Sequence, residues 1–441
     1  MGFMDNLSAE LAESNSNLSY TENGMEGYKS MGWGKKLVDF NFAVASMRGM
    51  ESDEIERRWI EAYVDNPKDA IKWLFYAGDV RGGLGERRLF RIIFNHMART
   101  NSKSHEAAKR LLYLIPEYNR WDSLFVSTYG TDLWQDTLNI VKDQLRKDID
   151  AMKSNQSVSL MAKWLPAENT RNKERRAMAL SIINSLGITE RRYRKVRHEL
   201  NVYLDTVELK INAKEFAAIN YEKVPSKANL KYKDLFLKND EERRNAYLES
   251  VSKGEAKIHA GVVYPYEIVA KYIHQLSYWC SASIGELDRS LEEMWRNLPN
   301  YDMNNRKILS IVDGSGSMWT HIPHTEIPAW CVGVAMGIYY SERLTGELHN
   351  TFMTFGHDPQ IVKFRDNLSL RDRIELSKKY TDCSNTNIQN VFELILQVAV
   401  DYKMKQEDIP EALMIISDME FDEGCNGCSS NVFNHYRKEY E

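Results

Sequence analysis

The run Lys307-Ile-Leu-Ser-Ile-Val-Asp-Gly-Ser-Gly-Ser-Met318 decides the fold of the last third of the chain. In it, a short apolar stretch leads directly into Asp313 and a turn of glycines and serines. Two more short apolar runs follow, at 351–355 and 412–417, and the second also ends in an aspartate, Asp418. Such runs are typical of strands buried on both faces of a sheet. Helical patterns separate them, at 329–344, 370–380 and 387–402. We therefore predict a doubly wound α/β domain with a parallel sheet, covering residues 301–441.

The preceding residues differ in composition and in the periodicity of their apolar positions. Residues 1–30 are rich in Ser, Asn, Gly and Glu without sustained periodicity, which predicts a flexible N-terminal arm. From 31 to 300, apolar residues recur at three- and four-residue spacing in successive segments, which predicts helices at 53–63, 67–76, 86–99, 104–114, 133–152, 173–186, 188–204 and 240–250. Helices joined by short turns, with almost no strand signal, predict an all-α helical-repeat region, either a solenoid or a closed ring. The predicted class is thus α followed by α/β.

Composition favours a soluble protein. The 441 residues are 43% hydrophobic and 27% charged, and no run approaches the roughly 20 apolar residues of a membrane span. The N-terminus lacks the charged-then-apolar pattern of a secretory signal, so we expect a cytoplasmic protein without a membrane partner. Five cysteines, an odd number, predict reduced thiols in such a chain. Cys425-Asn-Gly-Cys428 has zinc-knuckle spacing, but a second pair is missing, so loop thiols are the default interpretation.

Charge divides the chain unevenly. From Arg306 to the end there are 13 lysines and arginines against 20 aspartates and glutamates, a net charge of −7. The residues before Arg306 carry 45 against 43, a net charge of +2. The two halves are therefore expected to bind different partners.

Oxygen-bearing side chains gather where the predicted strands end. Asp313, Ser315 and Ser317 follow the first strand, Asp418 follows the last, and Thr386 precedes a helix. Because ligands bind at the carboxyl ends of the strands in such sheets, these five residues are predicted to hold one metal. Carboxylates and hydroxyls without His or Cys suit Mg²⁺, or Mn²⁺ or Ca²⁺, rather than zinc. The alternative is that Asp-Gly-Ser-Gly-Ser is only a flexible turn.

These motifs carry a resemblance. The run around Asp313, the Asn-Thr-Asn around Thr386 and Ile-Ile-Ser-Asp418 resemble the metal-ion-dependent adhesion site of von Willebrand factor A domains. Where that family often has a glycine two residues before its Thr, this chain has Ser384. The resemblance implies one metal with a coordination position open to a partner's carboxylate, which is a docking point rather than a catalyst. A complete domain of this type usually continues with a strand, a helix and a strand, so we expect a sheet short of its last strands. The expected reason is a fragment, completion by a partner chain or a degenerate module.

Basic residues concentrate in the helical region. Between 171 and 198, nine lysines and arginines stand against Glu174 and Glu190, a density that could neutralise several phosphates. A second cluster, at 81–91, lies beside a glycine turn, and Trp121, Trp164, Tyr193 and Tyr232 could stack on unpaired bases. The alternative is that the charges are solvated and the aromatic residues belong to the core. The predicted RNA-binding residues are Arg81, Arg87, Arg88, Lys163, Arg171, Arg175, Arg176, Arg191, Arg192, Arg194, Lys195 and Arg197.

The whole layout resembles the Ro autoantigen family, in which a TROVE module, a ring of helical repeats that binds RNA, precedes a von Willebrand A domain. It is more similar still to a bacterial and phage branch with that layout, through Ala77 to Arg88, Ser159 to Pro166, Ile219 to Ser226 and Gly254 to His259. The resemblance implies RNA binding, and residence in the host cytoplasm if the chain is phage-encoded.

Three functions remain open from the sequence. The first is a non-enzymatic RNA-binding protein whose metal module docks a protein partner, with no catalytic residue and no small-molecule substrate. The second is an assembly or scaffold factor that docks a partner, such as an AAA-type ATPase, without RNA. The third is a Mg²⁺-dependent nuclease that uses Asp418, Glu420, Asp422 and Glu423. Two-metal hydrolysis requires carboxylates shared between ions, and the hydroxyl-rich motif favours one metal instead.

Overall fold

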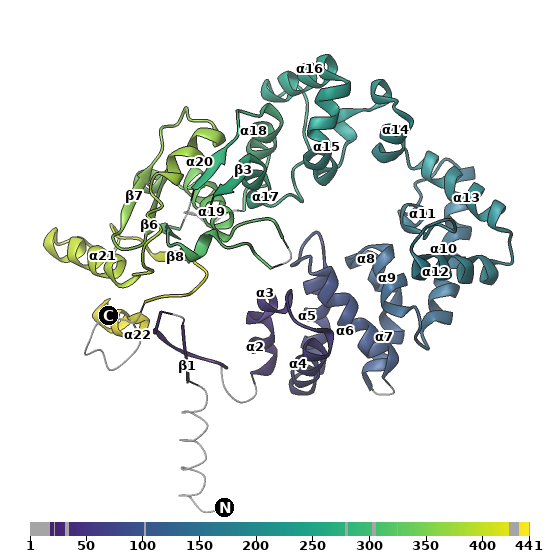
Figure 1. Ribbon diagram of the computed structural model, residues 1–441, viewed down its shortest axis with the longest axis horizontal. Coiled ribbons are helices and arrows are strands. Elements are labelled where there is room, and N and C mark those ends of the chain that lie inside the picture. The colour runs from purple at the N-terminus through teal and green to yellow at the C-terminus, as the bar shows by residue number, and fades with distance from the viewer. Residues whose placement is uncertain are drawn as a thin grey trace, which may run out of the picture. The chain divides into compact units, whose positions relative to one another are not determined.

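The computed structural model describes residues 18–21, 23–30, 35–100, 103–277, 281–301, 306–323, 325–422 and 432–440. The chain forms two compact units, the helical unit (31–219) and the sheet unit (1–30 with 220–441) (Figure 1). The predicted class, helices followed by α/β, is confirmed at this level. The predicted domain boundary at 300/301 falls inside the sheet unit, since residues 220–300 pack with the sheet. In the described part of the chain, no helix has the length and apolar character needed to cross a bilayer.

The helical unit consists of consecutive helices, and those between residues 36 and 203 share one apolar core. Its elements are α2 (Lys36–Phe42), α3 (Val44–Met47), α4 (Ser52–Asp65), α5 (Pro67–Gly78), α6 (Arg87–Arg99), α7 (Lys103–Leu111), η1 (Leu112–Leu114), α8 (Ile115–Tyr118), α9 (Trp121–Thr128), α10 (Trp134–Lys153), α11 (Met161–Trp164), α12 (Lys173–Leu186), α13 (Glu190–Tyr203), α14 (Val207–Ala213) and η2 (Phe216–Ala218). Helix α6 packs against α4, α5, α7 and α9, and Phe90 and Phe94 on it are fully buried. Phe75 of α5 meets both rings edge-on. Such packing of amphipathic faces explains why periodicity located these helices.

In the described residues, the first elements of the sheet unit are the hairpin strands β1 (Leu18–Tyr20) and β2 (Glu26–Tyr28), and the unit resumes after the helical unit. Its next elements are η3 (Tyr221–Lys223), α15 (Ser226–Asn239), α16 (Glu241–Ser252), α17 (Pro265–Val269), η4 (Ala270–Tyr272), the hairpin β3 (Ile273–Ser277) and β4 (Ser281–Ile284), and α18 (Arg289–Arg296). The α/β part follows with β5 (Ile308–Asp313), η5 (Ser317–Trp319), α19 (Ala329–Arg343), η6 (Gly346–Leu348), β6 (Thr351–Phe355), β7 (Gln360–Lys363), α20 (Leu370–Lys378), α21 (Gln389–Asp401), β8 (Ala412–Ile416) and α22 (Val432–Tyr440). The predicted arm at residues 1–30 thus contains a hairpin in its described part.

The central sheet has four strands in the described residues, in the order β7-β6-β5-β8. Strands β6, β5 and β8 are parallel as predicted, but β7 is antiparallel to β6 and forms an edge. Sequence analysis missed β7 because only Val362 is buried in this strand. The sheet is therefore mixed rather than purely parallel.

Side chains from alternate positions of the strands enter two cores. Val312 and Phe352 pack with α19 and α20 on one face, whereas Ile311 and Met353 pack with α21 and α22 on the other. This period-two alternation of two apolar faces is the physical reason for the continuous apolar runs in the sequence. The last helices and the sheet thus form three layers.

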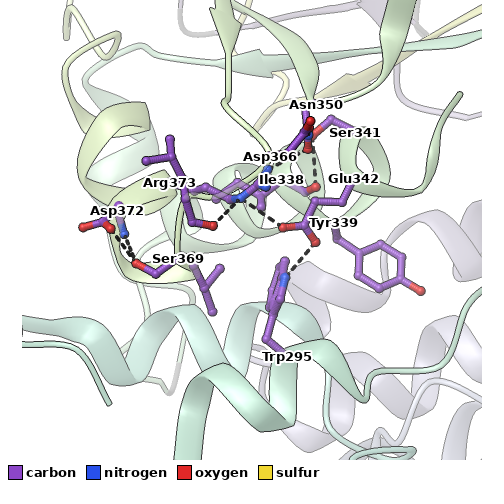
Figure 2. A network of polar contacts seen from close by, with 12 residues as sticks. Trp295, Ile338, Tyr339, Ser341, Glu342, Asn350, Asp366, Ser369, Asp372 and Arg373 are labelled. Carbon is purple, nitrogen blue, oxygen red and sulfur yellow. Dashed lines mark hydrogen bonds and ion pairs between the residues drawn. The ribbon is translucent and has the colours of Figure 1, made fainter. Parts of the chain in front are cut away.

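A buried polar network joins α18 to the helices of the α/β part (Figure 2). The Glu342 carboxylate accepts a hydrogen bond from Trp295 Nε1 at 2.8 Å and lies 3.3 Å from Arg373 Nε. Arg373 also donates to Asn350 Oδ1 at 2.7 Å. From α18, Glu292 accepts the backbone N–H groups of Leu370 and Arg371 at the start of α20, at 2.9 and 3.1 Å. A carboxylate there satisfies helix N–H groups that have no partner within the helix, so residues 220–300 are bonded firmly to the α/β part.

Candidate metal centre and nucleic-acid interface

The predicted metal ligands leave the sheet at one edge. Val312 of β5 is in register with Ile416 of the parallel neighbour β8, so Asp313 and the Ser417-Asp418 pair emerge side by side. On the other side, Asp313 is in register with Phe355, the last residue of β6. This is the carboxyl edge at which ligands bind in α/β sheets.

Asp313 is wholly buried, and the hydrogen bonds that it accepts from described residues come from neutral groups. Its Oδ2 accepts from Ser417 Oγ at 2.5 Å, and its Oδ1 accepts from the Ser315 backbone N–H at 2.8 Å. Burial raises the pKa of Asp313, the Ser417 and Ser315 hydrogen bonds oppose that effect, and the charge of Asp418 adds to it. In the part of the chain that the structure describes, no Lys, Arg or His forms an ion pair with Asp313. A cation is the kind of partner this carboxylate lacks.

The two serines of the motif stand beside Asp313 on a tight loop. Ser315 is buried, and its Oγ lies 3.1 Å from Ser317 Oγ. Gly314 donates its N–H to Phe355 O at 2.7 Å, and a Cβ at this position would lie 3.2 Å from the same oxygen. Glycine therefore lets the loop turn closely against the end of β6.

Thr386 lies on a loop that packs against this turn. Cys383 N–H donates to Gly314 O at 3.0 Å, and Asn387 N–H donates to Gly356 O at 3.1 Å. Thr386 itself is 2% exposed, and its carbonyl accepts the Asp422 N–H at 3.1 Å. The loop is thus tied both to the turn after β5 and to the segment after β8.

The structure brings all three predicted segments to this edge. Asp418 follows β8 by two residues and is half-buried, with its Oδ1 3.5 Å from the Glu420 N–H. The potential donors are two carboxylates and three hydroxyls, a set of hard oxygens that fits Mg²⁺, Mn²⁺ or Ca²⁺. Among the described residues, no three His, Cys, Asp or Glu side chains gather in a metal-binding group.

Two features of this edge have no signal in the sequence. Ser417 donates to Asp313 across 104 positions of the chain. The N-terminal hairpin fixes the segment after Asp418, because Thr21 Oγ1 donates to Phe421 O at 2.6 Å and Asn23 Nδ2 donates to Glu420 O at 2.7 Å. Met25 is buried in the same core as Phe421. Contacts over about 400 residues of separation depend on the tertiary fold and not on any local pattern.

A pair of tryptophans lies beside the site. Trp319 follows Ser317 by two residues and stacks on Trp330 at 4.6 Å between ring centroids. Trp330 Nε1 donates to Thr381 Oγ1 at 2.9 Å, on the approach to the Thr386 loop. A change at the site should therefore alter the fluorescence of this pair.

The predicted basic cluster lies on α12 and α13 and on the loop before α12. Six of its residues are exposed and form no ion pair within the described chain: Arg171, Lys173, Arg175, Arg176, Arg191 and Arg192. Arg194 is held by the buried Glu168 at 2.5 Å, and Lys195 lies 3.7 Å from Glu199. Arg197 is half-buried. We call the six exposed residues the α12–α13 basic surface.

The cluster at 81–91 has mainly internal contacts. Arg81 donates to Glu117 O, and Arg88 donates to Met47 O and Met50 O. The glycine turn does not offer its backbone to a ligand, since a Cβ on Gly83 would lie 1.8 Å from Tyr76 O at the end of α5. Among the expected stacking residues, Tyr193 and Trp121 are buried, which leaves Trp164 and Tyr232 partly accessible.

Comparison with known proteins gives two families and a viral relative. Residues 98–300 match a domain of unknown function, DUF2828, and residues 307–441 match another, DUF7788. The chain is also similar to an uncharacterised protein of Acanthamoeba polyphaga mimivirus, with 26% identity over 457 residues, 96% of this chain and 76% of the viral protein.

The two matched regions divide the candidate sites between them. All five predicted metal ligands lie in the region that matches DUF7788, and Lys163 with the basic residues at 171–197 lies in the region that matches DUF2828. Arg81, Arg87 and Arg88 lie outside both. The junction of the matches, between 300 and 307, follows α18, which the buried network bonds to the α/β part.

The cysteines differ from the predicted reduced set. Cys331 is free and buried, and burial raises the pKa of its thiol to about 12. Cys383 is disulfide-bonded, so the prediction of reduced thiols is wrong for this residue. Cys280, Cys425 and Cys428, together with Glu423 of the nuclease hypothesis, lie outside the described residues.

Proposed function

We propose that the sheet edge holds one divalent cation through Asp313, Ser315, Ser317, Thr386 and Asp418, and that the cation docks a protein partner. The observation that carries this proposal is the environment of Asp313, a fully buried carboxylate whose hydrogen-bond donors, in the described part of the chain, are all neutral. Burying a charge without a counter-charge is costly, and a cation would offset that cost. Mg²⁺ is the first candidate, with Mn²⁺ and Ca²⁺ as alternatives.

The proposed chemistry is coordination rather than catalysis. The cation would offer one open coordination position to a carboxylate of the partner. The resemblance to von Willebrand A modules implies such a position. A two-metal nuclease would need more shared carboxylates than the two among these five residues. We accordingly place the protein among non-enzymatic binding proteins, in the cytoplasm.

The site is tested by titrating the metal-free full chain with Mg²⁺, Mn²⁺ and Ca²⁺. Calorimetry and tryptophan fluorescence measure the binding. The wild type should bind one equivalent, and Asp313→Asn should lose binding. Asp408→Asn, which changes an exposed aspartate in the loop before β8, is the matched control and should bind normally. Binding that persists in Asp313→Asn would refute the site.

The docking step has its own test. With Mn²⁺ bound, an open coordination position retains an exchangeable water, which enhances the relaxation of bulk water protons. A Glu-containing peptide should displace that water and reduce the enhancement, whereas its Gln counterpart should not. No exchangeable water, or an equal effect of the two peptides, would contradict docking through the metal.

RNA binding by the helical unit is a second proposal, carried by a different observation. The six residues of the α12–α13 basic surface are exposed and form no ion pair with any residue that the structure describes, so their charges are available to phosphates. The layout that resembles Ro-type proteins supports the same reading. Salt-dependent binding of single-stranded RNA is the expected behaviour.

Two triple charge-reversal variants, one on the basic surface and one on α10, test this proposal. Arg176→Glu with Arg191→Glu and Arg192→Glu should abolish RNA binding at low salt, as measured by anisotropy of labelled RNA. Arg194 is left unchanged because its reversal would place a second carboxylate against the buried Glu168. Reversal of Arg146, Lys147 and Lys153 on α10 changes net charge equally and should have little effect.

Mg²⁺-dependent protein docking without any RNA binding would favour the scaffold alternative, and RNA cleavage lost in Asp418→Ala would favour the nuclease.

A further inference from the structure

A small cavity lies in the helical unit where α9, α11 and α12 meet. Its volume is about 270 Å³. The apolar part of its wall comes from Phe125 of α9, Leu165 and Pro166 of the loop after α11, and Met178 of α12. Lys163, Trp164, Arg175 and Asp122 also line it, and Val126, Ala167 and Thr170 complete the lining. We call it the Trp164 pocket.

The Trp164 ring is already used as a stacking surface. The guanidinium carbon of Arg120 lies 4.0 Å from its centroid, and Lys163 Nζ lies 6.0 Å from it. Stacking of a planar cation on an aromatic ring is favourable. The pair therefore presents flat, polarisable surfaces beside a cavity with apolar walls.

Positive charge exceeds negative charge around the pocket. Asp122, the acidic residue of the lining, is neutralised by Arg120 at 2.6 Å and by Arg91 at 2.7 Å. Lys163 pairs with Glu208 at 2.9 Å, whereas Arg175 is exposed and forms no ion pair in the described chain. Burial lowers the pKa of the nearby Arg87, and the charges of Arg120 and Arg91 lower it further. An anionic group would relieve this crowding.

The wall of the pocket is held in place from α13. Tyr193, which is buried, donates its hydroxyl to Pro166 O at 2.9 Å. Arg194 bonds the buried Glu168 in the same loop. The pocket is therefore built by packed elements, and Arg175 belongs both to it and to the α12–α13 basic surface.

We propose that the Trp164 pocket binds one unpaired nucleotide, with the base against the apolar walls and Trp164 and the phosphate near Arg175 and Lys163. Its volume is just below the range typical of drug-sized ligand sites, so it suits one base and excludes a duplex or a folded peptide. Apolar walls, an aromatic ring and surplus cations match a ligand that joins a flat ring to an anion. The source is either a free mononucleotide or a nucleotide within single-stranded RNA. In the latter form the inference rests on the RNA-binding proposal.

Binding of AMP and UMP by calorimetry and of labelled A8 and U8 RNA by anisotropy tests the pocket in the full chain. Trp164→Leu removes the ring, and Ala167→Phe fills the cavity while leaving Trp164 in place. Each should weaken binding by about tenfold or more, within the range of base stacking on aromatic side chains. Arg175→Gln should weaken binding less. The controls are Tyr113→Leu, an exposed ring elsewhere in the unit, and Arg146→Gln, with unfolding curves to verify the fold.

The outcomes distinguish a free mononucleotide from a nucleotide within RNA. They also distinguish failure of the pocket proposal from failure of the RNA-binding proposal. Loss of mononucleotide binding in both pocket variants supports a free nucleotide, and loss of RNA binding alone supports an RNA strand. Unchanged RNA affinity in both variants, with no mononucleotide bound by the wild type, overturns the pocket. In that case, loss of RNA binding on reversal of the α12–α13 basic surface would still uphold RNA binding. A wild type that binds neither RNA nor mononucleotides overturns both.

Discussion

Charged side chains have opposite environments at the carboxyl edge of the sheet and on the α12–α13 basic surface. Asp313 is wholly buried and accepts hydrogen bonds from neutral donors, whereas Arg176, Arg191 and Arg192 are exposed and have no ion pair among the residues described by the structure. A buried carboxylate without a counter-charge is stabilised either by a proton or by a cation at short range. Exposed arginines attract a mobile polyanion whose binding competes with salt.

This difference separates specific coordination from diffuse attraction within one chain. The net charges of the acidic C-terminal third and of the slightly basic remainder reflect this difference only as an average over many residues. In the structure, the contrast lies between the buried Asp313 and the exposed arginines of α12 and α13.

The largest effect is expected where the sheet unit buries an ion pair. Arg373→Leu removes the nearer cation of Glu342 and leaves the carboxylate with the Trp295 N–H and with Arg343, whose Nη1 lies 3.5 Å away. Loss of one partner of a buried pair costs about 3–5 kcal/mol, and because Arg343 remains we expect a loss at the lower end, about 3 kcal/mol. Urea unfolding of the full chain measures it. Replacement of Arg373 and Glu342 together by Leu should cost less than Arg373→Leu alone, because the carboxylate that lost its nearer cation is then removed as well.

The matched control lies on the exposed α10 of the helical unit. Arg146 lies 3.9 Å from Asp143, and both side chains are 68% exposed. Arg146→Leu should change stability by less than about 1 kcal/mol. Equal losses at Arg373 and Arg146 would remove the contrast between the two regions.

The second prediction compares the two sites at rising salt. If four phosphates are neutralised on the α12–α13 basic surface, RNA affinity should fall about 50-fold between 50 and 200 mM salt, since each phosphate contributes a slope of about −0.7 for single strands. Arg191→Gln with Arg192→Gln should reduce the slope by about 1.4. Mg²⁺ binding, measured in the same buffers, should change much less. Equal salt dependence would show that both sites act through the general electrostatic field.

The sequence predicted the regular elements well because their signals are local. The runs at 351–355 and 412–417 correspond to β6 and β8 within one residue, and the helix at 173–186 has the predicted bounds. Buried parallel strands and amphipathic helices impose periodicity on their own residues. The hairpins were missed because their strands are only three to five residues long, and β7 because only Val362 is buried in it, so no periodic apolar pattern marks them.

The candidate sites were predictable only in part. The motif residues around Asp313 could be identified because each follows a recognisable strand or precedes a helix. Ser417, Thr21 and Asn23 could not, since their contacts join segments that are 104 to 400 residues apart. Sequence density also could not separate the exposed Arg191 from Arg88, whose guanidinium caps backbone carbonyls. Exposure is a property of the packed structure.

The third prediction concerns Ser417. Its hydroxyl donates to the buried Asp313 carboxylate, and a hydrogen bond to a charged group contributes about 1.5–3 kcal/mol. Ser417→Ala should therefore lower the free energy of unfolding by that amount in EDTA, and by less with saturating Mg²⁺, since the cation then stabilises the carboxylate. Ser310→Ala, which removes a buried hydroxyl without a hydrogen-bond partner on β5, is the control and should be nearly neutral in both buffers. Equal losses from Ser417→Ala with and without Mg²⁺ would argue against a cation at Asp313.

The smallest expected effect tests whether the N-terminal hairpin supports the metal centre. Thr21→Val with Asn23→Ala removes the side-chain donors to Phe421 O and Glu420 O. These carbonyls lie two and three residues after Asp418, so Mg²⁺ affinity should fall about fivefold, equivalent to about 1 kcal/mol. Ser19→Ala, a change in β1 that removes no hydrogen bond to this segment, is the control for calorimetric titration. An unchanged Mg²⁺ affinity with a lower melting temperature would restrict the hairpin to stabilising the fold. A parallel loss of affinity would instead make residues 18–28 a working part of the sheet edge, because the position of Asp418 would then depend on a segment 400 residues away.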